Sequence, residues 1–515
     1  MRVAIVSVFV DYHRAGGHHR GVLQPQIGPL IAALLPDEAE VEIVNDTWTD
    51  PDWSRSYDLV FLSCMHSDFD RARQISHYYR RRGAKTVLGG IMAGTHTALC
   101  APWFDAVVVG DPEDTVPAIY ADAKAGRLKP LYRSGGYAPA LVPTPRVERV
   151  ARQQWFPLAM EVTRGCPYTC DFCALTGAGT RFETRPVQHV VRDIRRMQAA
   201  LSGLVRGWQR RLVMFYDNNL AGNLRYFREL CDALQPLGIE WATCLTFNVL
   251  TQRDLLRRMF DSGCRAVFVG LETFNPKALA DFHKPQNKLS QVRDALAQAR
   301  DEGILVTAGL ILSPLHDDPD YIRSLPGHLS DCGLHVPTFL CFETPIPGTP
   351  FFDRLAAAPE PAFLPHALLR DFNAYTLVAK PHACSPEEFV AAYRDVVRRL
   401  YAPGRRLAKL ADDLPRLLRR GSWTAAGLDL GDQLMAGQRH TPGRTYLGGT
   451  DLPPPESVPF TDDDFDSEAE RLRVCSPTVV TDGEGRVLPA WKMTHTVRPV
   501  ERPVALQSKA PTQSS

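Results

Sequence analysis

Short apolar runs alternate with amphipathic stretches through the first quarter of the chain. The apolar runs are RVAIVSVFV, VEIVN, YDLVFLSC, KTVLGG and FDAVVVG, and stretches such as FDRARQISHYYRRRG lie between them. The runs are apolar at nearly every position, so neither face of the predicted sheet would be exposed to water. The pattern predicts an open, doubly wound α/β domain in which helices cover a parallel sheet.

A second series of the same kind follows from Pro157. Six apolar runs, each followed by helix-like sequence, predict six strands: LAMEVT, LVMFYD, IEWATCLTF, RAVFVGLE, ILVTAGLILS and VPTFLCFE. Repeated βα units predict a partial or full barrel, in which catalytic groups gather at the carboxyl ends of the strands. The stretch before this series is rich in Gly, Pro and Arg and has no periodicity, so it is predicted to be a linker.

The pattern weakens beyond Phe351. EEFVAAYRDVVRRLYA, residues 387–402, is amphipathic with a helical period, and LAKLADDLPRLLRR continues helically. Cys475, in LRVCSPTVV, lies in a predicted strand. After about Gly437 the chain is rich in Pro, Asp and Gly, and its last 20 residues, 496–515, are predicted to be disordered.

Composition and charge exclude several function classes. The 59 Lys and Arg residues balance 58 Asp and Glu residues, so nothing in the charge predicts binding to nucleic acid or to a membrane surface. No run approaches the roughly 18 apolar residues of a membrane-spanning helix. The apolar start of the chain is short and meets DYHRAGG instead of a cleavage site, which argues against a signal peptide. We therefore expect a cytoplasmic protein.

Three cysteines follow the first strand of the second series: Cys166, Cys170 and Cys173. Most of the other cysteines are scattered singly inside apolar runs, as core residues are. Three thiolates on one loop can hold iron or zinc, and with three protein ligands one coordination position stays open to a substrate or cofactor. The alternative is a structural zinc site completed by His189 or another histidine.

The segment EVTRGCPYTCDFC resembles the CxxxCxxC signature of radical S-adenosylmethionine (SAM) enzymes. The resemblance implies a [4Fe-4S] cluster held by the three cysteines, with the amino and carboxylate groups of SAM on the fourth iron. It implies reductive cleavage of SAM to a 5′-deoxyadenosyl radical, and an external electron donor such as flavodoxin or ferredoxin. Phe172 would shield the cluster or stack near adenine, or else pack in the core.

Further segments resemble the family's SAM-binding segments in their usual order. They are MFYDNNLAGN, which has Asn218 where the family has Asp, FVGLETFNP, and the rigid turn TPIPGTPFFDRL. For Glu272, the carboxylate in FVGLETFNP, the alternative role is a surface salt bridge. The SAM-binding residues that the resemblance implies are Phe172, Asp217, Asn219, Glu272, Pro345 and Gly348.

The segment VDYHRAG, directly after the first strand, contains Asp11 and His13 at the DxHxxG spacing. It resembles cobalamin-binding domains in which the histidine is the lower axial ligand of cobalt and the aspartate orients it. Ser63, at a strand end, and Gly89 and Gly90, in VLGG, stand where the nucleotide tail would approach the backbone. The alternatives are a solvated loop histidine and a degenerate domain that binds nothing.

A cobalamin-binding domain followed by a radical SAM barrel resembles the cobalamin-dependent radical methylases. We therefore expect C-methylation of a small metabolite or natural-product intermediate. Tyr375, His382 and Cys384 are candidates to donate a hydrogen atom or contact the substrate, or else are structural. Cyclisation, ring contraction or oxidation without methyl transfer would use the same motifs. A cobalamin-binding regulatory protein with an inactive barrel is the alternative of a different class.

The predicted fold class is therefore α/β. Its parts are a doubly wound, Rossmann-like cobalamin-binding domain (1–132), a linker (133–156), a partial (βα)6 radical SAM barrel (157–357), a mostly helical C-terminal region (358–495) and a disordered tail (496–515).

Overall fold

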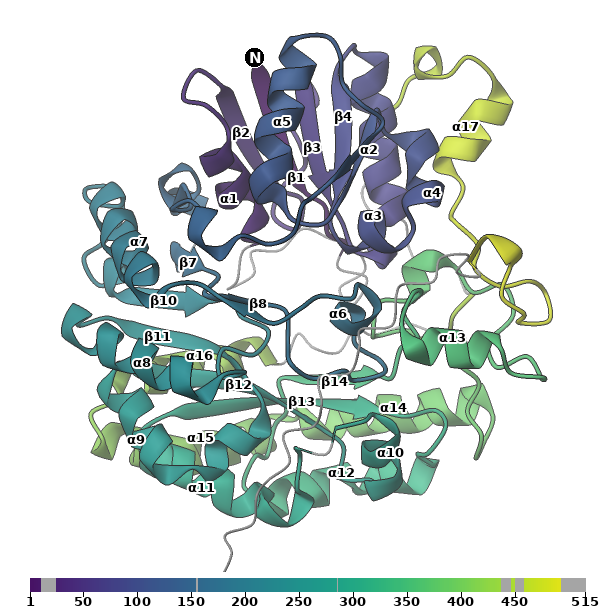
Figure 1. The fold of residues 1–515 in the computed structure, drawn as a ribbon. Helices are drawn as coiled ribbons and strands as arrows, with labels where there is room; N and C mark the ends of the chain where they lie inside the picture. Colours follow the sequence, from purple (N-terminus) through teal and green to yellow (C-terminus); the bar gives the residue numbers. More distant parts are fainter. Residues whose placement is uncertain (11–24, 154–155, 285, 437–445, 450–457, 492–515) are drawn as a thin grey trace, which may run out of the picture.

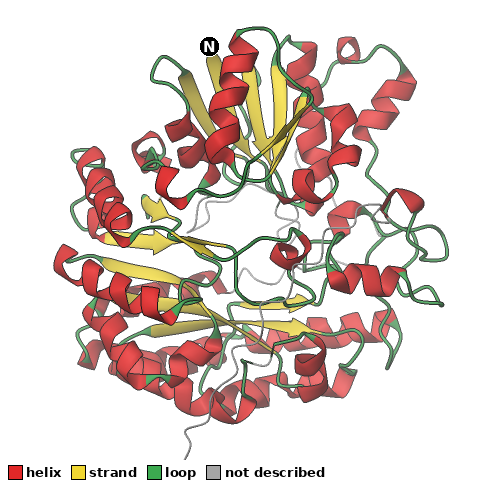
Figure 2. Ribbon diagram, viewed as in Figure 1, coloured by secondary structure: helices red, strands yellow, loops and turns green. Residues whose placement is uncertain are grey.

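Two parallel sheets and a set of C-terminal helices make up the protein (Figures 1 and 2). The computed structural model describes residues 1–10, 25–153, 156–284, 286–436, 446–449 and 458–491. None of the helices in this part of the chain has the length and hydropathy needed to cross a membrane. The predicted α/β class with parallel sheets is confirmed.

The first sheet has six parallel strands in the order β2-β1-β3-β4-β5-β6. They are β1 (Arg2–Ser7), β2 (Glu40–Asn45), β3 (Leu59–Ser63), β4 (Lys85–Gly89), β5 (Ala106–Val109) and β6 (Leu131–Arg133). Alternate residues of β1 face opposite layers, because side chains on a strand alternate. Val3 and Ile5 pack with α1 (Ile27–Leu34) and α5 (Pro112–Lys124), and Ala4 and Val6 pack with α2 (Phe69–Arg81) and α3 (Ile91–Thr95). Helices therefore cover both faces of the sheet.

The strand order of the first sheet reverses between β1 and β3. In doubly wound folds, ligands bind in the crevice at the carboxyl ends of the strands next to such a reversal. Ser63, the last residue of β3, pairs with Ser7 of β1 on one side and with Gly89 of β4 on the other. Two of the predicted cobalamin-binding residues, Ser63 and Gly89, thus lie side by side at this edge.

The second sheet contains all six predicted strands, parallel and in the order β14-β13-β12-β11-β10-β7. The strands are β7 (Leu158–Met160), β10 (Leu212–Phe215), β11 (Glu240–Leu245), β12 (Cys264–Glu272), β13 (Leu305–Leu312) and β14 (Phe339–Phe342). The helices along this series are α6 (Ala174–Gly177), α7 (Val187–Ala200), α8 (Leu224–Leu234), α9 (Arg253–Asp261), α10 (Pro276–Asp281), α11 (Val292–Asp301), α12 (Pro319–Asp331) and α13 (Pro350–Ala356). Within the described residues β7 and β14 are edge strands, so the sheet is open.

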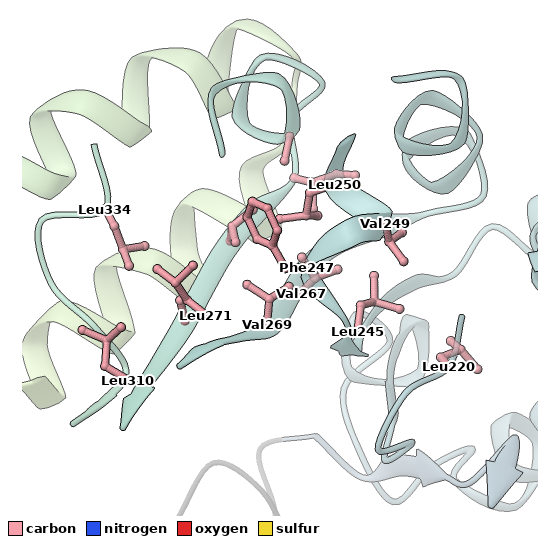
Figure 3. Close-up of a cluster of buried hydrophobic side chains, with 14 of the residues drawn as sticks. Leu220, Leu245, Phe247, Val249, Leu250, Val267, Val269, Leu271, Leu310 and Leu334 are labelled. Carbon is pink, nitrogen blue, oxygen red and sulfur yellow. The ribbon is translucent and has the colours of Figure 1, made fainter. Parts of the chain in front are cut away.

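The core of the second sheet lies between its strands and the outer helices. Figure 3 shows side chains of β11, β12 and β13 meeting there, among them Val267, Val269 and Leu271. The intervening residues of β12, Phe268 and Gly270, are less buried and belong to the opposite face of the sheet. The face of the sheet that carries Phe268 and Gly270 is therefore available for a functional site.

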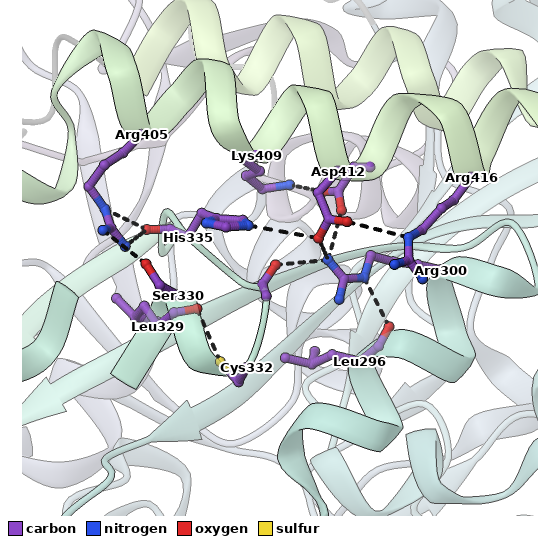
Figure 4. Close-up of polar contacts among 12 residues, drawn as sticks. Leu296, Arg300, Leu329, Ser330, Cys332, His335, Arg405, Lys409, Asp412 and Arg416 are labelled. Atoms are coloured by element: carbon purple, nitrogen blue, oxygen red, sulfur yellow. Dashed lines mark hydrogen bonds and ion pairs between the residues drawn. The ribbon is translucent and has the colours of Figure 1, made fainter. Parts of the chain in front are cut away.

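The C-terminal helices pack onto both sheets. They are α14 (Pro386–Leu400), α15 (Pro403–Arg419), α16 (Trp423–Ala436) and α17 (Glu468–Cys475). Figure 4 shows polar contacts that attach α15 to the second sheet's helices: the Arg300 guanidinium donates to Asp412 (2.8 Å) and Asp413 (3.0 Å). Lys409 is buried between Asp413 and Asp429, so its charge is balanced. Burying a charge otherwise costs several kcal/mol.

The predicted strand around Cys475 is wrong, because this residue ends helix α17. Ser467 caps the helix by accepting a hydrogen bond from the Glu470 backbone N–H, and two glutamates occupy the first turn. These helix-start signals outweigh the short apolar run that suggested a strand.

Candidate functional site

The three cysteines lie on the loop between β8 (Thr163–Arg164) and α6. An antiparallel pairing of β8 with β9 (Glu183–Thr184) closes the base of this loop. Gly165 has φ +79° there, and a Cβ at this position would lie 2.1 Å from the Arg181 carbonyl oxygen. Within the loop the Cys173 N–H donates to the Cys170 carbonyl (3.1 Å). Cys166 and Cys173 are partly exposed, so the loop is held firmly at its base and its thiols stay accessible.

The surroundings of the thiols suit an anionic iron–sulfur cluster. Burial raises the pKa of Cys170 to about 12, and the nearby Lys284 ammonium opposes the rise. The Asn219 side-chain N–H donates to the Cys166 sulfur at 3.9 Å. Hydrogen bonds and positive charge near the sulfurs are among the features by which proteins tune such clusters. Among the described residues, no group of three His, Cys, Asp or Glu side chains, the loop cysteines and His189 included, is placed to hold a metal ion.

Asp217 and Asn219 follow β10 and are both buried, but they contact different parts of the cysteine segment. The Asp217 carboxylate accepts hydrogen bonds from the Val162 N–H (3.2 Å) and from the Thr163 N–H and hydroxyl (2.6 Å for the hydroxyl). Burial raises its pKa to about 7. Asp217 thus fixes the strand that leads into the cysteine loop, and Asn219 contacts the loop itself.

Glu272 ends β12 and forms a buried ion pair with Lys284. The glutamate adopts φ +69°, next to a register shift in the strand pairing. A Cβ at Gly270 would lie 2.0 Å from the Glu272 carboxylate and 2.7 Å from the Lys284 nitrogen, so the pair fills the space that a side chain would take. The alternative role for Glu272, a surface salt bridge, is wrong as to its place, because both partners of the ion pair are buried.

The closing segment after β14 packs against the cysteine loop. A Cβ on Gly177, in α6, would lie 2.4 Å from the Gly348 carbonyl oxygen, and the Phe351 N–H donates to the Asp171 carbonyl (3.2 Å). Pro345 and Gly348 are buried, and Gly348 has φ +89°. The structure thus brings the predicted turn and the cysteines together.

Three candidates remain in the second sheet and the C-terminal region: Tyr375, Cys384 and Phe172. Tyr375 forms a hydrogen bond with the Cys341 thiol of β14. Burial raises the pKa of that thiol, and the Glu272 carboxylate raises it further. Cys384 only packs against the hydrophobic core. Phe172 packs edge-on against Phe282, with ring centroids 5.3 Å apart, as in its core alternative. Tyr375 is thus linked to Glu272 through the Cys341 thiol.

The N-terminal candidates gather at the carboxyl edge of the first sheet. Gly90 has φ +92°, and a Cβ there would lie 2.9 Å from the Ser63 hydroxyl oxygen and 3.1 Å from the Cys64 carbonyl oxygen. Among the described residues, no atom lies within 4 Å of the corresponding position at Gly89. The described part of the chain thus leaves the backbone at Gly89 open to close approach. His13 lies outside the described residues.

Sequence reasoning assigned no partner to Arg164, which connects the two sheets. Its guanidinium contacts Asp111 (2.7 Å) and Glu113 (3.0 Å), at the carboxyl end of β5, and Glu161 (2.7 Å) before the cysteine loop. The Tyr137 ring stacks on it at 4.0 Å. The Arg-Gly pair before the first cysteine was the available signal, but Asp111 and Glu113 lie 53 and 51 residues away in sequence.

Glu343 is a second residue that sequence reasoning missed. It follows β14, is buried, and accepts a hydrogen bond from the Ser313 hydroxyl (2.6 Å). Burial raises its pKa to about 8, so it carries a proton at neutral pH. Only its place at a strand end, which it shares with Glu272, could have indicated it.

The raised pKa of Glu343 predicts a pH-dependent stability. Between the unfolded pKa, about 4.3, and the folded pKa, the folded state holds a proton that the unfolded state releases, so stability falls as pH rises. In Glu343→Gln the free energy of unfolding should lose this pH dependence, which is up to about 1.4 kcal/mol per pH unit. The stability of the variant should be closest to that of the wild type near pH 5. Urea unfolding of both proteins at pH 5, 6.5 and 8 measures it. Parallel pH profiles would show that Glu343 is ionised in the folded protein.

Comparisons with known proteins agree with this geometry. Residues 160–325 match the model of the Radical SAM superfamily. The chain is 26% identical over 405 residues to hopanoid C-2 methylase of Rhodopseudomonas palustris, covering 74% of this chain and 72% of that one. It is 25% identical over 338 residues to bacteriochlorophyllide d C-8(2)-methyltransferase of Chlorobaculum tepidum, covering 63% and 74%.

A solved structure shares the fold. It is the radical SAM methyltransferase TsrM from Kitasatospora setae with cobalamin and a [4Fe-4S] cluster bound, with a TM-score of 0.57, 18% identity, and coverage of 78% of this chain and 88% of that one. The chain therefore contains a radical SAM domain and is similar to a hopanoid methylase and a bacteriochlorophyllide methyltransferase.

Proposed function

We propose that the chain is a cobalamin-dependent radical SAM enzyme that methylates carbon in a small metabolite or natural-product intermediate. The observation that carries the proposal is the meeting of the two sheets at the cysteine loop. Arg164, at the start of the loop, contacts Asp111 and Glu113 of the first sheet, and Gly348 lies against Thr95 of the same region. A methyl donor at the edge of the first sheet would thus face a radical generated at the loop, and such proximity lowers the barrier to transfer.

Each group of residues has a separate task in this proposal. Cys166, Cys170 and Cys173 hold the cluster, and the Asn219 side chain donates a hydrogen bond to the Cys166 sulfur. Glu272 and Lys284 together present a carboxylate and an ammonium to the amino and carboxylate groups of SAM. When bound, the cluster and SAM supply the radical, and cobalamin supplies the methyl group. The chain itself orients these groups and limits the access of water.

The edge of the first sheet is the proposed cobalamin site. Ser63, Gly89 and Gly90 lie together at the edge where the strand order reverses, and no atom of the described residues covers the backbone at Gly89. This is the place at which doubly wound sheets receive nucleotide-like ligands. His13 as the lower ligand of cobalt, the domain limits given above, a flavodoxin or ferredoxin as electron donor, and a cytoplasmic location belong to the same proposal.

The proposal is tested by following the methyl group. The anaerobically reconstituted protein is given cobalamin, a one-electron reductant, SAM labelled in its methyl group, and a panel of polycyclic and isoprenoid-like substrates. Label in a product carbon, with 5′-deoxyadenosine formed alongside, supports methylation. Deoxyadenosine with a rearranged, unlabelled product would indicate the other radical reactions. Cobalamin binding without iron would indicate the regulatory protein.

A further inference from the structure

Two buried histidines share one hydroxyl group at the junction of the two sheets. His66 begins the turn after β3, and His96 follows α3. The Thr95 hydroxyl oxygen lies 2.8 Å from Nε2 of His66 and 2.9 Å from Nδ1 of His96. The two rings stand nearly perpendicular, with centroids 5.3 Å apart. Both side chains are more than nine-tenths buried.

The hydrogen bonds of Thr95 fix which ring nitrogens carry protons. A threonine hydroxyl has one hydrogen to donate and can accept two. Thr95 donates its hydrogen to the Ile91 carbonyl (2.9 Å), so both histidines must donate to its oxygen. Burial also lowers the pKa of His66 to about 3 and that of His96 to about 4, so both rings are neutral. Nδ1 of His66 and Nε2 of His96 are therefore bare acceptors.

These two acceptors have no donor among the described residues. The nearest indole, that of Trp491, packs 5.1 Å from the His96 ring but gives its N–H to the Val479 carbonyl (2.9 Å). Buried polar atoms in folded proteins are nearly always paired, because an unpaired acceptor destabilises the fold. The two acceptors in this cluster can therefore receive hydrogen bonds from a binding partner that brings donors.

The place of the cluster indicates which partner that is. His66 lies three residues beyond Ser63, and Gly90, which packs against Ser63 and Cys64, begins the segment that ends in Thr95 and His96. On the other side, a Cβ at Gly348 would lie 3.3 Å from Thr95 and 3.6 Å from His96. The pair thus lies beside the proposed cobalamin site and against the closing segment of the radical SAM sheet.

We propose that His66 and His96 form a subsite that accepts hydrogen bonds from N–H or O–H groups of bound cobalamin. The inference rests on the proposed function, because it needs cobalamin at the edge of the first sheet. Cobalamin carries primary amides around the corrin ring and hydroxyl groups in its nucleotide tail, and either can supply the donors. The neutral, acceptor-only state of both rings is what such donors require.

The test compares cofactor affinity with the stability of the cofactor-free protein. His66→Phe and His96→Phe are made separately, so that one remains informative if the other fails to fold. Each should raise the Kd for cobalamin about tenfold, which is about 1.4 kcal/mol. Each should leave the Tm of the cofactor-free protein unchanged or higher, because an unpaired buried acceptor has been removed. If either histidine only supported the fold, its replacement would lower the Tm of the cofactor-free protein as well as raise the Kd.

His77→Phe is the matched control, because His77 lies on α2 and contacts the Asp464 carbonyl (2.7 Å) away from this cluster. It should leave the Kd unchanged. Repeating the titrations with cobinamide, which has no nucleotide tail, locates the donors: a weakening only with cobalamin places them on the tail, and a weakening with both places them on the corrin amides. Unchanged affinity in both variants would overturn the subsite, whereas a wild type that binds no cobalamin would instead overturn the proposed function.

Discussion

Replacing Cys170 with alanine is expected to abolish iron binding and SAM cleavage together. With only two thiolates left on the loop, a four-iron cluster loses one of its three protein ligands. Loss of a ligand should cost more than the 10- to 100-fold that loss of a supporting hydrogen bond usually costs. Iron analysis, electron paramagnetic resonance of the reduced protein and chromatography of 5′-deoxyadenosine measure the effect.

Cys475→Ala provides the control for the cysteine substitution. Cys475 is exposed at the end of α17 and lies outside the cysteine loop, so its loss should leave iron content and SAM cleavage at the level of the wild type. If Cys170→Ala kept its iron, the cluster would have to be held elsewhere. If the wild type bound zinc in preference to iron, the site would be structural.

Replacing Arg164 with leucine is expected to destabilise the protein by about 3–5 kcal/mol at neutral pH. The change leaves Asp111, Glu113 and Glu161 facing one another without their shared cation. Burial already raises the pKa of Glu161, and Arg164 opposes that rise in the wild type. Without Arg164 the folded pKa of Glu161 rises further above its unfolded value. The loss of stability should therefore be largest above that folded pKa and shrink as Glu161 becomes protonated on acidification.

Urea unfolding of Arg164→Leu at pH 5 and pH 8 tests this expectation. Arg258→Leu is the control, since Arg258 and Asp232 form an exposed ion pair whose loss should cost less than about 1 kcal/mol at both pH values. A deficit in Arg164→Leu that is the same at both pH values would mean that lost packing, such as the stacking on Tyr137, accounts for it. An unchanged stability would show that the sheets do not depend on this contact.

The sequence predicted the strands well because both sheets are parallel and covered by helices. Such strands are apolar along their whole length, so every strand of the second sheet stood out from its surroundings. Helix α8 begins at Leu224, where the Asn223 side chain caps it. The predicted strand at Cys475 was wrong because a short apolar run fits a strand or a helix, and the capping residues favour the helix.

The candidate site was predictable only where its residues are close in sequence. The cysteines and the closing turn form continuous motifs, and the structure brings them together. Lys284, Arg164 and the pairing of Tyr375 with Cys341 depend on residues that meet only in the folded chain. The orientation of His66 and His96 likewise follows from a single hydroxyl between them, which no sequence pattern specifies.

The packing of the chain's end against its beginning has a consequence for biosynthesis. Asp70 of α2 accepts a hydrogen bond from the Thr478 N–H (3.0 Å), and Trp491 belongs to the same apolar cluster as the strands of the first sheet. Because the N-terminal part leaves the ribosome first, the apolar surface that Trp491 covers stays exposed until that segment has been translated. The newborn chain should therefore depend on chaperones for most of its synthesis, and C-terminal truncations should yield aggregated protein even where the cysteine loop is intact.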